Sequence, residues 1–157
     1  MLKYPLILFG FLFLNLNLFA QSGNIAFKNA IHFDLASGKF IGMYALNFEK
    51  NILQLNNFKM NANAGAGAWY LSTISNWYSG KSISLSLNNL VGKKQDFFEF
   101  DLGIRYTAFN KNSDKDISPF FPIFNLGYRH QKPTGKGLIF RTYIGLSGIG
   151  LGLGKAF

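Results

Sequence analysis

The most constraining feature of this sequence is a strict two-residue alternation of apolar and polar side chains. Across residues 98–108 every second residue is apolar, and those between are Glu, Asp, Gly, Arg and Thr. Residues 58–70 show a similar alternation, and residues 82–88 show it over a shorter stretch. Because successive side chains of a β-strand point to opposite sides, this pattern predicts strands with one apolar and one polar face.

Further candidate strands bring the total to eight, at roughly residues 25–35, 40–49, 119–130, 138–146 and 149–157. Clusters of Gly, Ser, Asn and Pro separate the segments, and no gap is long enough for the crossover helix that a parallel sheet needs. We therefore predict an all-β fold, an eight-stranded antiparallel up-and-down barrel in which the first strand pairs with the last.

The first twenty residues have the features of a secretory signal peptide. Lys3 precedes an apolar run over residues 5–19, and polar residues follow at once. A membrane-spanning helix needs ~20 apolar residues, whereas this run is shorter and contains two Asn. We predict that residues 1–20 are a signal peptide, that residues 21–157 form the barrel domain, and that the protein is exported.

An exported eight-stranded barrel is either a soluble lipocalin-like carrier with an apolar interior or a transmembrane outer-membrane barrel with an apolar exterior. The apolar face of the predicted strands carries aromatic residues near both strand ends and mainly Leu, Ile and Ala between them, which is typical of a lipid-facing surface. These aromatic residues are Phe48, Phe58, Phe98, Tyr128 and Phe157 at one end, and Phe40, Tyr70, Tyr106 and Phe120 at the other. The pattern favours the outer membrane, with the polar face toward the lumen.

Composition excludes several other classes of protein. The chain is 48% hydrophobic and 15% charged, which argues against disorder, and the absence of Cys excludes disulfides and Cys-ligated metals. A net charge of +9 with many aromatic residues could indicate nucleic-acid binding, but export and membrane-facing aromatics argue against it. Several lysines fall instead in predicted turns at one end of the barrel, where they are either solvated or in contact with anionic lipid headgroups. They are Lys50, Lys93, Lys94, Lys132 and Lys136.

The last predicted strand alternates Ile and Leu with Gly and ends on Phe157. It resembles the assembly signal of Gram-negative outer-membrane barrels. Two longer stretches, residues 84–99 and 124–141, are similar to a family of small uncharacterised outer-membrane β-barrel proteins, and the resemblance extends over most of residues 31–157. It departs from the family near residues 144–149, where the last hairpin loop is much shorter. The resemblance implies a barrel, a membrane location and contact with the barrel-assembly machinery, and it brings no catalytic residues.

The polar face contains a candidate charge cluster near one end of the lumen. Antiparallel pairing around the loop at residues 110–116 predicts Glu99 opposite Arg129, with Asp101 one step away on the same face. The next hairpin predicts Arg141 opposite Gly127. We therefore expect Glu99, Asp101, Arg129 and Arg141 to form a buried lumenal cluster.

Residues of catalytic type are few. His32 and Asp34 share the lumenal face, and together with Ser84 or Ser86 they could form a hydrolase or acyltransferase site, or they could belong to a polar network. No nucleophile motif, metal-ligand pair or phosphate-binding loop accompanies them, so we expect no cofactor.

The sequence favours a non-enzymatic, monomeric protein with a structural, envelope-stability or surface-interaction role. The alternatives are an outer-membrane lipid-modifying enzyme of the acyltransferase or lipase type, and a soluble lipocalin-like carrier.

Overall fold

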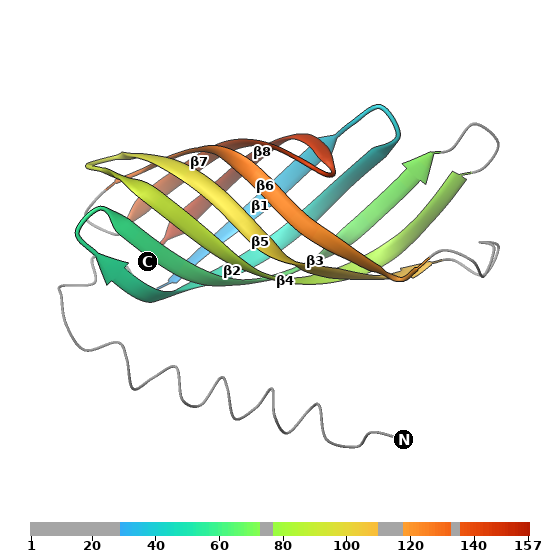
Figure 1. Ribbon diagram of the computed structural model, residues 1–157, viewed down its shortest axis with the longest axis horizontal. Coiled ribbons are helices and arrows are strands. Elements are labelled where there is room, and N and C mark those ends of the chain that lie inside the picture. The colour runs from blue at the N-terminus through green and yellow to red at the C-terminus, as the bar shows by residue number, and fades with distance from the viewer. Residues whose placement is uncertain (1–28, 73–76, 110–117, 133–135) are drawn as a thin grey trace, which may run out of the picture.

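The computed structural model describes residues 29–72, 77–109, 118–132 and 136–157, and these form eight β-strands and no helix (Figure 1). No helix in this part of the chain is long and apolar enough to cross a membrane. The predicted signal peptide, residues 1–20, lies outside the described residues. The strands are β1 (Asn29–Ser37), β2 (Ile41–Leu55), β3 (Phe58–Ser72), β4 (Trp77–Lys93), β5 (Asp96–Phe109), β6 (Phe120–Gln131), β7 (Gly137–Gly145) and β8 (Gly148–Ala156).

The strands form one closed antiparallel barrel in which each strand pairs with its neighbours in sequence (Figure 1). β1 and β8 close the barrel, with partners running from Ala30 and Ala156 to Ser37 and Ile149. Two backbone hydrogen bonds between Asn29 and Phe157, of 3.2 and 2.9 Å, extend this seam by one residue on each strand. The predicted all-β, eight-stranded antiparallel barrel is therefore confirmed, as is the pairing of its first and last strands.

The strands differ in length, from nine residues in β1, β7 and β8 to seventeen in β4. β2 ends at Leu55 rather than near residue 49 as predicted. A β-bulge between Asn51 and Leu53 keeps β2 paired with β3 while the alternation shifts by one residue. The bulge interrupts the sequence pattern, which is why the prediction ended the strand too early.

The barrel has two distinct ends. At the proximal end, on the left in Figure 1, β1 begins, β8 ends and the connections β2–β3, β4–β5 and β6–β7 lie. The other four connections lie at the distal end. This division follows from the up-and-down order alone, since every strand reverses the direction of the one before it.

The two faces of the barrel wall have opposite chemistry. On β5, Asp101 and Arg105 are 3% and 6% exposed inside the barrel, whereas Leu102 and Ile104 are 47% and 50% exposed outside it. Every one of the eight strands places large apolar side chains on the outer surface. The polar face lines the lumen, which is the orientation that the sequence predicted.

Candidate functional site in the barrel lumen

A layer of buried ionisable and amide side chains fills the middle of the lumen, and we call it the lumenal charge network. Strand alternation points each member inward, and none is more than 9% exposed. Its ionisable members come from β1, β2, β5, β6 and β7. The members are His32, Asp34, Glu49, Glu99, Asp101, Arg129 and Arg141, with Asn47, Asn61, Asn88 and Asn125.

Arg129 and Glu49 form a paired, two-pronged salt bridge across the lumen. Nη1 of Arg129 donates to Oε1 of Glu49 at 2.9 Å, and Nη2 donates to Oε2 at 2.8 Å. Both side chains are completely buried. Because β6 and β2 are not neighbouring strands, this pair ties opposite sides of the wall together.

Arg141 is surrounded by three carboxylates. Its Nη1 donates to Oδ2 of Asp34 at 3.2 Å, and its Nη2 donates to Oδ2 of Asp101 at 2.7 Å and also pairs with Glu99. The guanidinium on β7 therefore connects β1 with β5 through the lumen. A planar group with several fixed donors suits this task better than an ammonium would.

His32 lies between two carboxylates. Nδ1 is 3.0 Å from Oδ1 of Asp34, and Nε2 is 3.0 Å from Oε1 of Glu49. A carboxylate only accepts hydrogen bonds, so both ring nitrogens are best matched when both carry protons, as in the imidazolium form. In this arrangement His32 acts as a third cation of the network beside Arg129 and Arg141.

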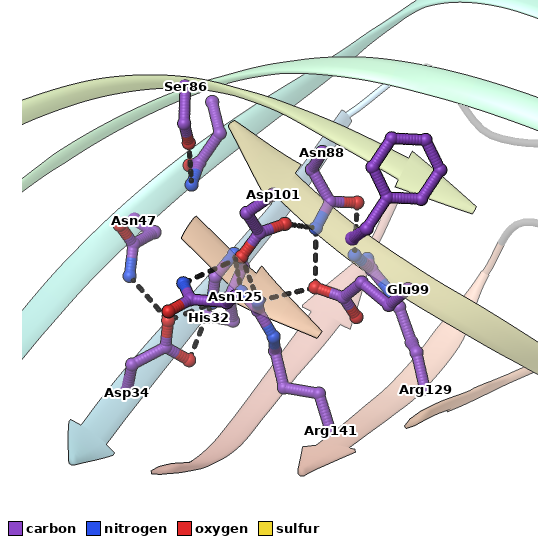
Figure 2. Close-up of polar contacts among 12 residues, drawn as sticks. His32, Asp34, Asn47, Ser86, Asn88, Glu99, Asp101, Asn125, Arg129 and Arg141 are labelled. Carbon is purple, nitrogen blue, oxygen red and sulfur yellow. Dashed lines mark hydrogen bonds and ion pairs between the residues drawn. The ribbon is translucent and has the colours of Figure 1, made fainter. Parts of the chain in front are cut away.

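Asparagine side chains link the two arginine-centred groups (Figure 2). Nδ2 of Asn88 donates to Oδ1 of Asp101 at 2.5 Å and also to Glu99, while its Oδ1 accepts from Nη1 of Arg129 at 3.4 Å. Asn125 donates to Asp101 at 3.1 Å. The network is therefore one connected unit rather than a set of separate pairs.

The described lumen holds cations in slight excess over carboxylates. Four carboxylates face it, those of Asp34, Glu49, Glu99 and Asp101. The cationic side chains are His32 and three arginines, since Arg105 also lies inside, where it donates to Ser147 at 3.2 Å, and Lys59 of β3, which is 6% exposed and lies over the ring of Phe97. With His32 protonated, five cations therefore face four carboxylates, so most of the buried charge is compensated within the lumen.

All four residues of the predicted cluster, Glu99, Asp101, Arg129 and Arg141, lie in this network, but with different neighbours. Glu99 pairs in the sheet with Gly127 rather than with Arg129, and Arg141 lies opposite Arg129 rather than opposite Gly127. Each hairpin is shifted by two residues from the predicted register. A shift of two keeps every side chain on its face, so the residues remain in the lumen while their pairing changes.

The residue that sequence reasoning missed is Glu49, the partner of Arg129. Its place on the polar face follows from alternation, but its contact with Arg129 joins strands that are far apart in the barrel order. Such a contact cannot be predicted from hairpin register or from sequence spacing. It depends on the diameter and stagger of the closed barrel.

The possible catalytic group of His32, Asp34 and a serine is assembled only in part. His32 and Asp34 are in contact, but the second ring nitrogen of His32 faces Glu49. Ser86 accepts a hydrogen bond from Nδ2 of Asn63 at 3.3 Å, and Figure 2 shows it apart from His32. Among the described residues, no hydrogen bond joins His32 to a serine.

Apolar layers lie on both sides of the lumenal charge network. Toward the distal end Ala36, Met43, Trp69 and Tyr143 form a buried cluster, and Phe121 packs on it with its ring 4.6 Å from that of Trp69. Toward the proximal end there is a smaller buried cluster. It consists of Ala30, Ile139 and Ala156. The network therefore lies between two apolar clusters, in a type of barrel that is just wide enough to be filled by its own side chains.

The glycines of β8 provide the space for these inward side chains. A Cβ atom at Gly152 would lie 2.2 Å from Oδ1 of Asp34 and 2.5 Å from Cγ of Arg141. One at Gly150 would lie 2.1 Å from the ring of Tyr143. The Gly alternation of this strand thus leaves room for bulky groups from β1 and β7.

Comparison of the chain with protein-family models, with curated proteins and with solved structures found no match. Within the described residues, no three His, Asp or Glu side chains are arranged so that they could hold a metal ion.

Proposed function

We propose that this protein is exported to the outer membrane of a Gram-negative cell, where it forms a small transmembrane barrel without enzymatic activity. Its role is structural, in envelope stability or in interactions at the cell surface. The observation that carries the proposal is the apolar outer wall, which continues around all eight strands.

The extent of this wall argues for lipid as its surroundings. Soluble monomers rarely expose apolar patches of more than about 300–600 Å². Here large side chains such as Leu85, Leu102, Ile104 and Leu151 are between 43% and 55% exposed on strands from every side of the barrel. Even the shortest strands have nine residues, and a tilted strand needs about 9–11 to cross a bilayer.

Exposed aromatic residues near both ends of the wall support the same conclusion. Phe48, Phe98, Tyr128, Phe140 and Phe157 lie toward the proximal end, and Phe40, Tyr70, Tyr106 and Phe120 toward the distal end. Aromatic rings favour the boundary between headgroups and acyl chains. Two such rings of side chains with an apolar band between them fit a protein that spans one bilayer.

The charged interior favours a structural role over transport or catalysis. A pore needs an open channel and a lipocalin-like carrier needs an apolar cavity, whereas this lumen holds a connected network of buried charges between two apolar clusters. A lipid-modifying enzyme would need a nucleophile beside His32, and that ring is held between Asp34 and Glu49. We expect outer-membrane lipid and, during biogenesis, the barrel-assembly machinery to be its partners, and the folded protein to be a monomer.

Cell fractionation with a heat-modifiability gel tests this proposal. The full chain is expressed in a Gram-negative host, membranes are separated by density, and the outer-membrane fraction is run on a gel with and without boiling. We expect the protein in that fraction, with the unheated barrel migrating differently from the boiled chain. A protein that stays in the aqueous periplasmic extract without detergent would overturn the proposal.

The role itself is tested in the native host. Loss of the gene should increase sensitivity to detergents or to large antibiotics that an intact outer membrane excludes, and the wild-type gene should restore resistance. As a matched control, the variant His32→Gln should also restore resistance if it folds, since no catalytic step is proposed. A folded His32→Gln barrel that fails to restore resistance would favour the lipid-modifying enzyme instead.

A further inference from the structure

The proximal end of the barrel carries an uneven share of the surface charge. Six exposed lysines lie there, and we call them the proximal lysine belt. They are Lys50, Lys93, Lys94, Lys132, Lys136 and Lys155. In the described part of the distal end, only Lys39 and Lys81 are exposed cations. Residues 110–117, between β5 and β6 in sequence, lie outside the described residues and include two Lys and two Asp.

Within the described part of the chain, these lysines have no acidic side chain as a partner. The exposed side-chain carboxylate described at the proximal end is that of Asp96, and it is already engaged by Tyr128, whose hydroxyl donates to Oδ1 at 2.5 Å, and by Nδ1 of His130 at 2.9 Å. No ion pair among the described residues involves any of the six belt lysines. The positive charge of the belt is therefore available to an outside anion.

The lysines are spread around the barrel rather than gathered on one side. They come from β2, from the end of β4, from the β4–β5 and β6–β7 connections, and from β8. A folded protein partner would contact one side, whereas a layer of lipid headgroups meets the whole circumference. The belt also lies next to the aromatic ring. Lys50 lies two residues beyond Phe48 on the same face of β2, about 7 Å farther toward the proximal end. Lys155 lies two residues before Phe157 on the same face of β8, level with the aromatic ring itself.

From this arrangement we infer that the proximal lysine belt binds the phosphate groups of anionic phospholipids in the leaflet at that end of the barrel. The inference rests on the proposed membrane location and adds a lipid class and a side of the membrane to it. An aromatic ring at the acyl boundary puts the ammonium of Lys50, two residues farther out, at the depth of the phosphates. Lys155 starts level with the ring, and its long side chain can extend outward to the same depth. Each lysine contributes a modest attraction, and six of them give a clear preference over zwitterionic lipid.

Lipid selectivity can be measured by electron spin resonance. Protein purified in folded form from membranes is placed in phosphatidylcholine bilayers that contain trace spin-labelled phosphatidylglycerol or spin-labelled phosphatidylcholine. The relative association constant of the two labels is then compared for three proteins at low salt. These are the wild type, the pair Lys50→Gln with Lys155→Gln, and the matched distal pair Lys39→Gln with Lys81→Gln.

We expect the wild type to prefer phosphatidylglycerol by at least about twofold, because headgroup charge adds to the attraction of each lysine. The proximal pair should lose a substantial part of this preference, while the distal pair keeps it. Equal preference for the two lipids in the wild type, or equal losses in the two pairs, would overturn the inference.

Two controls distinguish phospholipid binding from the binding of free phosphate and from a failure of the barrel to insert. Inorganic phosphate and NaCl at equal ionic strength should weaken the preference equally, and a stronger effect of phosphate would identify free phosphate as the ligand and overturn the lipid assignment. Heat modifiability is recorded for every sample. A barrel that does not insert contradicts the proposed function, whereas an inserted barrel without lipid preference contradicts only the lysine belt.

Discussion

The inner and outer faces of the same strands follow opposite rules. On β5 the inward residues Glu99 and Asp101 are buried and bonded to Arg141 and Asn88, while the outward residues Leu102 and Ile104 are exposed and touch no core. A soluble barrel would reverse this. The comparison teaches that the solvent around the wall, and not the fold, decides which face is apolar.

The two faces also differ in how their residues depend on one another. Each charge of the lumenal charge network is bonded to at least one other member, so removing one partner leaves another buried with fewer partners. In the proposed membrane setting, each apolar side chain outside acts almost alone through the surface that it would present to lipid. Substitutions inside the barrel should therefore be strongly coupled, and those outside should be additive.

The largest effect is expected from breaking the pair across the lumen. Arg129→Met should lower the free energy of unfolding by about 3–5 kcal/mol, because Glu49 remains buried without its guanidinium partner. Adding Glu49→Gln should recover part of the loss. Urea unfolding in lipid vesicles measures the free energy of unfolding of the single and the double variants. A double variant with the summed losses of the two single variants would show that the charges are not coupled.

A charge introduced on the outer face should destabilise the barrel less than the loss of Arg129. Leu102→Arg should lower the free energy of unfolding by about 2–4 kcal/mol if the residue lies near the bilayer midplane. The matched control is Leu138→Arg, which is exposed at the start of β7 near the proximal end and should cost about 0–1 kcal/mol. Equal losses at the two positions in the same urea experiment would contradict a bilayer around the wall.

The space beside β8 gives a smaller and purely steric test of the interior. Gly152→Ala adds a methyl group against Asp34 and Arg141 and should cost about 1–3 kcal/mol. Leu151→Ala on the outer face of the same strand serves as the control, because its side chain is 55% exposed and meets no lumenal group. A Gly152→Ala barrel as stable as the wild type would mean that the network moves aside without cost.

The smallest change in stability is expected at the end of the last strand. Deleting Phe157 removes one exposed ring and two backbone hydrogen bonds to Asn29, so refolding into detergent should be impaired only slightly. In cells, the amount of folded protein in the outer membrane should fall much more if Phe157 is an assembly signal. Unchanged cellular assembly would make it simply a member of the aromatic ring.

Much of the fold could be predicted from local pattern. Alternation together with turn residues identified eight strands, and alternation assigned Asp101 and Arg105 to one face and Leu102 and Ile104 to the other. The prediction was less accurate where local pattern is interrupted, as at the bulge near Asn51 that prolongs β2. Register was also wrong by two residues in the β5–β6 and β6–β7 hairpins, because no turn motif in their loops sets it.

The sequence by itself determined which side chains face inward, because the two-residue period of a strand is a property of the backbone and needs no tertiary contact. It therefore placed Glu99, Asp101, Arg129 and Arg141 in the lumen. Only the tertiary structure decided that Arg129 forms a salt bridge with Glu49 and that Arg141 forms salt bridges with Asp34, Glu99 and Asp101. Those contacts cross the barrel, and they exist only once its closure and stagger bring distant strands face to face.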